Sequence, residues 1–383
     1  MDFSWNKTQL ALKEKVIQFA QTLNDNLVER DKQGLFSREQ WQKCADFGIL
    51  KLYLPTIYGG DNYDLLTAVL AMEAFGYGCR DNGLVLALNE HIWCIQQPFL
   101  IFASEEQKQK YLPAFCSGEL ICTQAISEES AGSDALNMQT TAQKVTGGYL
   151  LNGKKSYISL APVAELSLVF AKTNLQAAQW GISLFLVENN ATGCTPIPRD
   201  KMGTRTNPLG DLVFEDCFVP EANRIGREGI GVSVFSQTMD WERSFILASY
   251  VGAMAYQLEQ SVHYAKNRQQ YGEPIGNYQS VSNRIADMKS RLEIARLLLY
   301  KQAWQKQNQK LNLMDAAITN LHISESFLQS SLDAVRIHGG RGYLSEFGIE
   351  RDLRDAVGSV IYAGTSDIQR NIIAKLLGKR IKS

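Results

Sequence analysis

The sequence of 383 residues lacks the cysteine pattern of a disulfide framework or a zinc site. Its seven cysteines are odd in number, scattered and without close pairs, whereas both kinds of site need cysteines at short, paired spacings. Reduced thiols in a cytoplasmic protein are the simplest interpretation. The opening stretch MDFSWNKTQL also lacks a basic segment followed by an apolar one, so no signal peptide is predicted.

Long apolar runs and clusters of one charge are missing as well. No uninterrupted apolar segment approaches the roughly 20 residues that span a bilayer, so we expect no membrane segment. The 39 basic and 40 acidic residues give a net charge of −1, with no long run of either sign. Because binding to nucleic acid or to anionic membranes needs clustered Lys and Arg, we expect neither as a partner.

The motifs of several enzyme classes do not occur. The chain contains no G-x-S-x-G, no P-loop and no H-E-x-x-H, which leaves hydrolase and nucleoside-triphosphatase functions without support. The four histidines have no metal-ligand spacing, so no metal site is predicted.

The spacing of the apolar residues that are present divides the chain into three parts. Residues 1–120 follow a helical period and predict an N-terminal α-helical domain. Residues 121–233 contain short β-branched and aromatic runs between Gly, Asn, Asp and Pro, which predicts an antiparallel β domain. Residues 234–383 predict long helices in a C-terminal four-helix bundle. This α, β, α order predicts an α+β protein and argues against a Rossmann fold.

Local signals place several helix starts and turns. Ser37 with Gln40 and Ser104 with Gln107 form capping boxes, and Asp64 is a further N-cap. Turns are predicted at 147–148 and at 152–153. One continuous helix is predicted over 241–267.

Two glycine-containing segments could approach an anion. The segment 125–134, AISEESAGSD, has small residues and hydroxyls in a turn, which can bring backbone N–H groups to a phosphate. A surface loop explains the same residues. The segment 339–342, GGRG, follows a helix and matches no complete dinucleotide fingerprint, so a glycine C-cap is the better explanation.

Two further segments could carry acid–base or oxyanion chemistry. In YAGTSD at 362–367, Ser366 with Gln369 predicts a capping box, and the helix N-terminus could hold an oxyanion. In DWER at 240–243, which we expect to start a long helix, Glu242 could compensate the helix dipole or form a solvated pair with Arg243. Alternatively, the surrounding apolar side chains desolvate Glu242 and make it a useful base.

Taken in order, these segments resemble the acyl-CoA dehydrogenase family over nearly the whole chain. The matching motifs are AISEESAGSD at 125–134, KKSYIS at 154–159, NRQQYG at 267–272, IHGGRG at 337–342 and YAGTSDIQR at 362–370. The resemblance implies a helical domain, a β domain and a C-terminal four-helix bundle. It also implies an FAD cofactor between the β domain and the bundle, and a homotetramer.

The resemblance assigns flavin contacts to individual residues. Those at the flavin and its pyrophosphate are Ile126, Ser127, Gly132 and Ser133. Those covering the flavin ring are Tyr157 and Ser159, with Thr365 and Asp367 in the final motif. Those reaching the FAD of a neighbouring subunit are Arg268, Tyr271 and Gln279, with Arg336, Gly339 and Gly340 at its adenine end.

Ala363 departs from the pattern of the family. Many members have the catalytic glutamate at this position, and alanine cannot accept a proton. A minority, such as the isovaleryl-CoA dehydrogenases, place the glutamate on a bundle helix just before an arginine, and Glu242–Arg243 matches that arrangement. The resemblance therefore implies Glu242 as the catalytic base, the Ala363 backbone N–H as a donor to the substrate carbonyl, and Arg243 and Tyr362 as substrate contacts.

A narrower resemblance concerns the substrate. MDWERSFILASYVG at 239–252, DAVRIHGGRGYL at 333–344, LNEHIWC at 88–94 and the Y-A-G-T-S-D ending are similar to the prolyl-carrier-protein dehydrogenases. This implies oxidation of an L-prolyl thioester on a phosphopantetheinylated carrier protein, as in natural-product biosynthesis. Glu129 and Ser130 replace a usual Pro-Gly in the flavin motif. The alternatives are a short- or branched-chain acyl-CoA dehydrogenase and a non-catalytic flavin-binding subunit.

Overall fold

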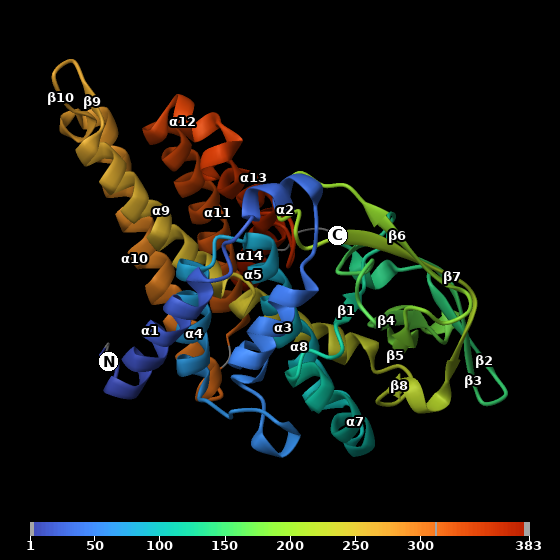
Figure 1. The fold of residues 1–383 in the computed structure, drawn as a ribbon. Coiled ribbons are helices and arrows are strands. Elements are labelled where there is room, and N and C mark those ends of the chain that lie inside the picture. The colour runs from blue at the N-terminus through green and yellow to red at the C-terminus, as the bar shows by residue number, and fades with distance from the viewer. Residues whose placement is uncertain (1–3, 311, 379–383) are drawn as a thin grey trace.

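The computed structural model describes residues 4–310 and 312–378. Its N-terminal and C-terminal helices pack together, and the large sheet lies to one side of them, whereas the β9–β10 hairpin lies at the far end of the helices (Figure 1). Within the described residues, no helix is both long and apolar enough to cross a membrane. All seven cysteines are free and buried.

The N-terminal part is helical, as the sequence predicted. Its helices are α1 (Lys7–Gln21), α2 (Leu27–Gln33), α3 (Arg38–Phe47), α4 (Leu65–Gly78), α5 (Asn82–Asn89), the π-helix η3 (Glu90–Gln96), α6 (Gln97–Phe102) and α7 (Glu105–Cys116), with short 3-10 turns η1 (Ile49–Lys51) and η2 (Thr56–Tyr58). The Ser104–Gln107 capping box and the Asp64 N-cap are confirmed. Ser37 caps α3, but the Gln40 side chain donates to the Leu23 carbonyl instead of completing a box.

The central part forms a mixed sheet, so the prediction of a purely antiparallel domain was wrong in part. Its strands are β1 (Cys122–Ala125), β2 (Thr141–Val145), β3 (Gly148–Ser159), β4 (Leu166–Lys172), β5 (Ile182–Glu188), β6 (Cys194–Arg199), β7 (Leu209–Pro220) and β8 (Arg224–Ile225). The order is β6-β7-β3-β2-β4-β5-β8. β1 runs parallel to β4, with Cys122 beside Leu166, and β2 meets β4 in parallel at one position. Short 3-10 turns interrupt this part at η4 (Ala135–Asn137), η5 (Leu175–Gly181) and η6 (Glu221–Asn223).

Two glycine turns were predicted in this region, and one of them is wrong. The turn at 147–148 joins β2 to β3, and Gly147 has a φ of 82°. Residues 152–153 instead lie inside β3, where the pairing with β7 shifts register at Gly153. Such a shift is a β-bulge, which glycine at a φ of 140° accommodates without a side-chain clash.

The C-terminal part is again helical. Its elements are α8 (Gly231–Phe245), α9 (Ala248–Asn267), the hairpin β9 (Gln269–Gln270) and β10 (Glu273–Pro274), η7 (Ile275–Asn277), α10 (Gln279–Gln307), α11 (Leu313–His338), α12 (Gly340–Tyr343), η8 (Ser345–Phe347), α13 (Ile349–Ser359) and α14 (Ser366–Leu376). The single helix predicted over 241–267 is two helices, because the chain leaves helical geometry at Leu247. Gly339, with a φ of 59°, ends α11 as the C-cap that the sequence suggested.

Two glycines bring the N-terminal and C-terminal helices into close contact. A Cβ atom on Gly76 of α4 would lie 1.9 Å from the Ser249 carbonyl oxygen, and one on Gly252 of α9 would lie 1.9 Å from the Glu73 carbonyl oxygen. A further, partly buried contact joins Glu73 to Arg296 of α10, at 2.7 Å. The helices therefore form one shared hydrophobic core, against which α8 is held.

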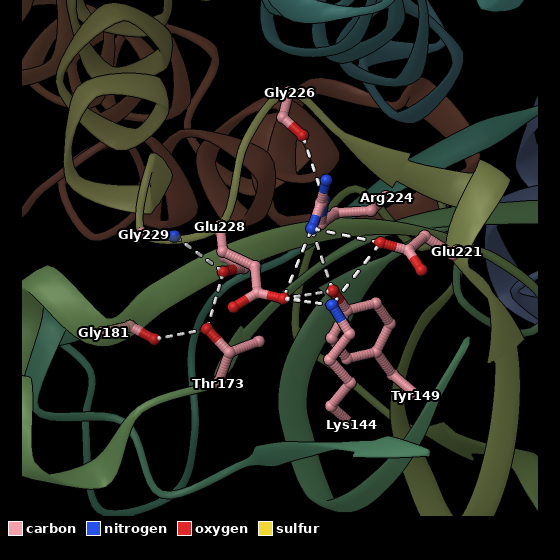
Figure 2. A network of polar contacts seen from close by, with 10 residues as sticks. Lys144, Tyr149, Thr173, Gly181, Glu221, Arg224, Gly226, Glu228 and Gly229 are labelled. Carbon is pink, nitrogen blue, oxygen red and sulfur yellow. Dashed lines mark hydrogen bonds and ion pairs between the residues drawn. The ribbon is translucent and has the colours of Figure 1, made fainter. Parts of the chain in front are cut away.

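A polar network fixes the chain where the sheet leads into α8 (Figure 2). Arg224 Nη1 donates to Tyr149 Oη at 2.9 Å and contacts Glu228 at 3.3 Å. Lys144 of β2 contacts the same Glu228 carboxylate at 3.4 Å and Glu221 at 3.6 Å. These contacts tie the β2–β3 hairpin to the segment just before α8, and so orient α8 relative to the sheet.

Candidate active site

The sheet, α8 and the loop before α14 enclose a cavity of about 440 Å³. The eleven predicted site residues that line this cavity are Ile126, Ser127, Gly132, Ser133, Tyr157, Ser159, Glu242, Arg243, Tyr362, Ala363 and Thr365. They come from segments more than 200 residues apart in the chain, and we name the space they surround the flavin cavity.

The remaining predicted residues do not reach the flavin cavity. Asp367 is exposed on α14 and pairs with Arg370 at 3.0 Å. Arg268, Gly339 and Gly340 line a second cavity of about 990 Å³ between α9, α11 and α12. Of the others, Tyr271 is 97% exposed, Gln279 starts α10, and Arg336 contacts Asp333 at 3.8 Å. In Figure 1 the β9–β10 hairpin beside Arg268 lies at the end of the bundle away from the sheet.

Glu242 lies in the last turn of α8 and not at the start of a helix, so that prediction was wrong. α8 begins at Gly231 without a side-chain cap, which leaves no capping signal in the sequence. Trp241 and Phe245 turn into the core, and Trp241 stacks on Trp93 with ring centroids 6.0 Å apart. The neighbouring Glu242 consequently faces the flavin cavity.

The turn that carries Glu242 is anchored to two other helices. Asp240 forms an ion pair with Lys306 of α10. Ser244 accepts a hydrogen bond from Gln302 of α10 at 2.9 Å, and the Arg243 carbonyl accepts one from Asn320 of α11 at 3.5 Å. These contacts therefore fix the position of the helix turn that carries Glu242.

The surroundings of Glu242 make its carboxylate a stronger base. Burial and, to a smaller extent, the negative charge of Glu90 raise its pKa, and Arg243 lowers it in part, so that the pKa of Glu242 is about 7. The negative end of a helix dipole also disfavours a carboxylate, and α8 ends here. A base with a pKa near the working pH is suited to general base catalysis.

A buried ion pair shapes the loop over residues 126–133. Lys155 Nζ, which is fully buried, donates to Glu128 Oε1 at 2.9 Å and to the Ile126 carbonyl at 2.9 Å. Glu128 also accepts hydrogen bonds from the Thr140 N–H at 2.9 Å and hydroxyl at 2.6 Å. Burial alone would raise the pKa of Glu128, but the charge of Lys155 and these hydrogen bonds outweigh it and lower the pKa. The ion pair between Glu128 and Lys155 thus fixes the conformation of the loop over residues 126–133.

An irregularity in β3 presents two polar side chains to the cavity. The pairing of β3 with β7 shifts register between Lys155 and Ile158. Tyr157 lies in this bulge with a φ of 62° and is 57% exposed. The Ser159 carbonyl accepts a hydrogen bond from the Thr123 hydroxyl of β1. Bulges of this kind re-aim side chains beside active sites.

In the loop before α14, the backbone N–H groups of Ala363, Gly364 and Thr365 have no hydrogen-bond acceptor among the described residues. Ala363 has a φ of 60°, and Gln369 Nε2 donates to its carbonyl at 3.0 Å and to that of Gly364 at 2.8 Å. Within the described part of the chain, no acceptor is recorded for the Ala363 N–H. The predicted Ser366–Gln369 box is wrong, since Thr365 is the N-cap and accepts from the Ile368 N–H at 3.2 Å.

Unpartnered polar atoms in the flavin cavity fit a polar cofactor. Gln124 Nε2 and Arg243 Nε are buried without a hydrogen-bond partner among the residues described, although buried polar groups are normally paired. A Cβ atom on Gly132 would meet nothing within 4 Å, so the loop has open space in front of it. Hydroxyls from Ser127, Ser133 and Thr365 line the same space.

The sequence did not single out several residues that line the flavin cavity. They are Glu90 and Cys94 of η3, Thr123 and Gln124 of β1, and Phe235 and Met239 of α8. Phe235 and Met239 lie seven and three residues before Glu242, on the same face of α8, and this helical spacing was a usable signal. Glu90 lies in the LNEHIWC stretch, where nothing local distinguishes it from a solvated carboxylate.

The chain belongs to the acyl-CoA dehydrogenase family. Models of the family's N-terminal, middle and C-terminal domains match residues 6–119, 123–217 and 229–378. This confirms the expected family and fold, and the family is FAD-dependent.

Three relatives are similar over almost the whole chain. The L-prolyl-[peptidyl-carrier protein] dehydrogenase of Pseudomonas fluorescens is 42% identical, over 98% of this chain and 100% of that protein. The structure of the prolyl acyl carrier protein oxidase AnaB has 46% identity and a TM-score of 0.96, covering 98% of this chain and 100% of AnaB. That of PigA with FAD and proline has 40% identity and a TM-score of 0.95, covering 99% of both chains.

Proposed function

We propose that the chain is an FAD-dependent dehydrogenase that oxidises an L-prolyl thioester carried by a phosphopantetheinylated carrier protein. The observation that carries this proposal is the Glu242 carboxylate, with a pKa of about 7, in the cavity that also holds the polar loop 126–133. The similarity to AnaB, PigA and the Pseudomonas fluorescens enzyme supports the prolyl group and the carrier protein. A catalytic carboxylate argues against a non-catalytic flavin-binding subunit.

The proposed reaction removes one proton and one hydride from neighbouring carbons. A thioester acidifies its α-proton because the developing charge spreads onto the carbonyl oxygen. Glu242 accepts the α-proton, and the Ala363 N–H donates a hydrogen bond to that oxygen. A donor fixed at a developing oxyanion typically contributes about 3 kcal/mol. When bound in this cavity, FAD would supply the acceptor for the hydride that leaves the β-carbon. The product carries a C=C bond conjugated with the thioester.

The residues proposed to hold FAD are those that the cavity brings together. They are Ile126, Ser127, Gly132 and Ser133 on the loop, Tyr157 and Ser159 on β3, and Thr365 at the start of α14. Arg243 and Tyr362 are proposed substrate contacts, and the Tyr362 hydroxyl is oriented by donating to Tyr250 Oη at 2.7 Å.

We also propose a homotetramer in which the second cavity completes the FAD site of a neighbouring subunit. The support is its position: Arg268, Gly339 and Gly340 line a space of about 990 Å³ that shares no lining residue with the flavin cavity. The positively charged Arg268 side chain can pair with a phosphate group of the neighbouring subunit's FAD. The glycines let the backbone approach a ligand closely, since a Cβ atom on either would meet nothing within 4 Å.

The rate of flavin reduction is expected to rise with pH through about 7 and then level off. Glu242 accepts a proton only as the carboxylate, and its pKa of about 7 means that acid converts it to the inactive protonated form. Anaerobic rapid mixing across about pH 5.5 to 9, with FAD content checked at each pH, measures the profile. A rate that falls with rising pH would contradict the assignment.

The proposed function is tested by the mass of the carrier-bound product. Incubation of the enzyme with L-prolyl-carrier protein is expected to remove two hydrogens, or four after a second oxidation, by intact-protein mass spectrometry. We further expect kcat/KM for L-prolyl-carrier protein to exceed that for L-prolyl-CoA by at least about tenfold. A carrier protein adds protein–protein contacts, and about 1.4 kcal/mol suffices for that factor. Equal values for the two substrates would remove the reason for proposing a carrier protein as the acyl donor, and loss of no hydrogen from either substrate would refute the function.

A further inference from the structure

A second carboxylate, Glu90, lines the flavin cavity together with Glu242. It begins the π-helix η3, which follows α5 directly. π-Helical turns are rare and occur frequently at functional sites, because they displace a side chain from its helical position. The negative charge of Glu90 acts on Glu242 strongly enough to contribute to its raised pKa. The two carboxylates therefore face a common space.

Glu90 has no counter-ion within the residues that the structure describes. Its Oε2 accepts a hydrogen bond from Asn207 Nδ2 at 3.1 Å, and Ser159 is a second hydrogen-bond partner. Lys201 contributes a favourable charge, but its Nζ donates to Thr204 Oγ1 at 3.1 Å and makes no recorded ion pair with Glu90. Burial raises the pKa of Glu90, and these partners lower it only in part.

A buried carboxylate at the position of Glu90 does not suit a substrate whose acyl group is a hydrocarbon. Burying a charge costs free energy unless it is paired, and a hydrocarbon acyl group offers no partner. The charged residues lining the flavin cavity are Glu90, Glu242 and Arg243, so its wall is acidic. A carboxylate has about four lone-pair sites, and the two recorded partners leave room for another donor. These features fit a cationic group on the ligand.

We propose that Glu90 binds the secondary ammonium group of an aminoacyl thioester substrate. This inference rests on the proposed function, since a prolyl thioester carries such a nitrogen on the carbon that Glu242 deprotonates. Holding the nitrogen fixes the α-carbon relative to the Glu242 carboxylate. Glu90 is thus a specificity-determining and positioning residue, and Glu242 remains the base.

The test compares two carrier-bound substrates of the same ring size. One is L-prolyl, and the other is cyclopentanecarbonyl, which lacks the nitrogen. For Glu90→Gln, we expect kcat/KM for the prolyl substrate to fall on the order of 10–100-fold, as for the loss of a hydrogen bond to a charged group. The value for cyclopentanecarbonyl is expected to change by less than about threefold. Glu188→Gln, the same change on the exposed end of β5, is the matched control and leaves both values unchanged.

The outcomes separate this inference from the proposed function. If wild-type protein oxidises the prolyl substrate and Glu90→Gln lowers kcat/KM equally for both substrates, Glu90 is merely structural and the inference is wrong. If wild-type protein does not oxidise the prolyl substrate, the proposed function itself fails. A second measurement needs no variant: L-prolinamide should bind to the wild-type holoenzyme at least about tenfold more tightly than cyclopentanecarboxamide, by calorimetry. Equal affinities would overturn the proposal even if Glu90→Gln does not fold.

Discussion

Glu242→Gln is expected to abolish turnover while the protein stays folded and keeps its FAD. Glutamine preserves the volume and hydrogen-bonding reach of the side chain but cannot accept the α-proton. Losing a general base typically lowers a rate by about 10²–10⁴, and the anchored turn of α8 keeps the substituted side chain in the same position. Anaerobic rapid mixing with L-prolyl-carrier protein, followed by flavin absorbance, measures the effect.

The matched control for this variant is again Glu188→Gln, which is expected to react at the wild-type rate. Because Gln fits the Glu242 site, FAD content and thermal unfolding should match those of the wild-type protein. A Glu242→Gln protein whose flavin is reduced at the wild-type rate would show that another residue is the base.

Glu128→Ala is expected to have the largest effect on stability. The change leaves the fully buried Lys155 ammonium without its carboxylate and the Thr140 N–H without an acceptor. Breaking a buried ion pair by removing one partner typically costs about 3–5 kcal/mol. We expect a loss of this size in chemical denaturation. FAD binding should weaken as well, since the loop that Glu128 holds lines the flavin cavity.

The control removes both charges. In Glu128→Met with Lys155→Met, no buried charge is left unpaired, and such replacements are often neutral or stabilising. The double variant should therefore recover a large part of the stability that Glu128→Ala loses. A Glu128→Ala protein that is destabilised by less than about 1 kcal/mol would refute the role given to this pair.

The sequence singled out Glu242, which the structure places in the lining of the flavin cavity, but it predicted the wrong position for this residue in its helix. The pairing of Glu242 with Arg243 was recognisable because the motif is local in sequence. Its place in α8 was not, because Ile230 supplies no side-chain cap at the helix start and the break at Leu247 carries no Gly or Pro. A helical period alone does not reveal such boundaries.

Glu90 could not be found from local sequence at all. It follows a run of buried apolar residues in α5, and a single carboxylate there is compatible with a solvated position. Its significance depends on Asn207, Ser159 and Glu242, which lie 69 to 152 positions further along the chain. The parallel pairing of β1 with β4 could not be predicted from local sequence either, because hairpin signals indicate pairing only between strands that follow each other in the chain.

The motifs at 267–272 and 337–342 were found from sequence, but their spatial role was not. Arg268 and Gly339 meet across a second cavity, because the hairpin after α9 and the end of α11 come together there. The sequence of one chain cannot specify which subunit's cofactor they approach, because subunit contacts arise between surfaces that are distant in sequence.

The most direct test of the central claim is one anaerobic mixing of wild-type holoenzyme with L-prolyl-carrier protein. Without oxygen, electrons removed from the substrate remain on the flavin, so oxidation of the thioester and loss of flavin absorbance must coincide. We predict that the flavin absorbance is bleached within a single turnover, and that the carrier-bound prolyl group loses two hydrogens. Flavin that stays oxidised in the presence of fully loaded carrier protein would contradict the account.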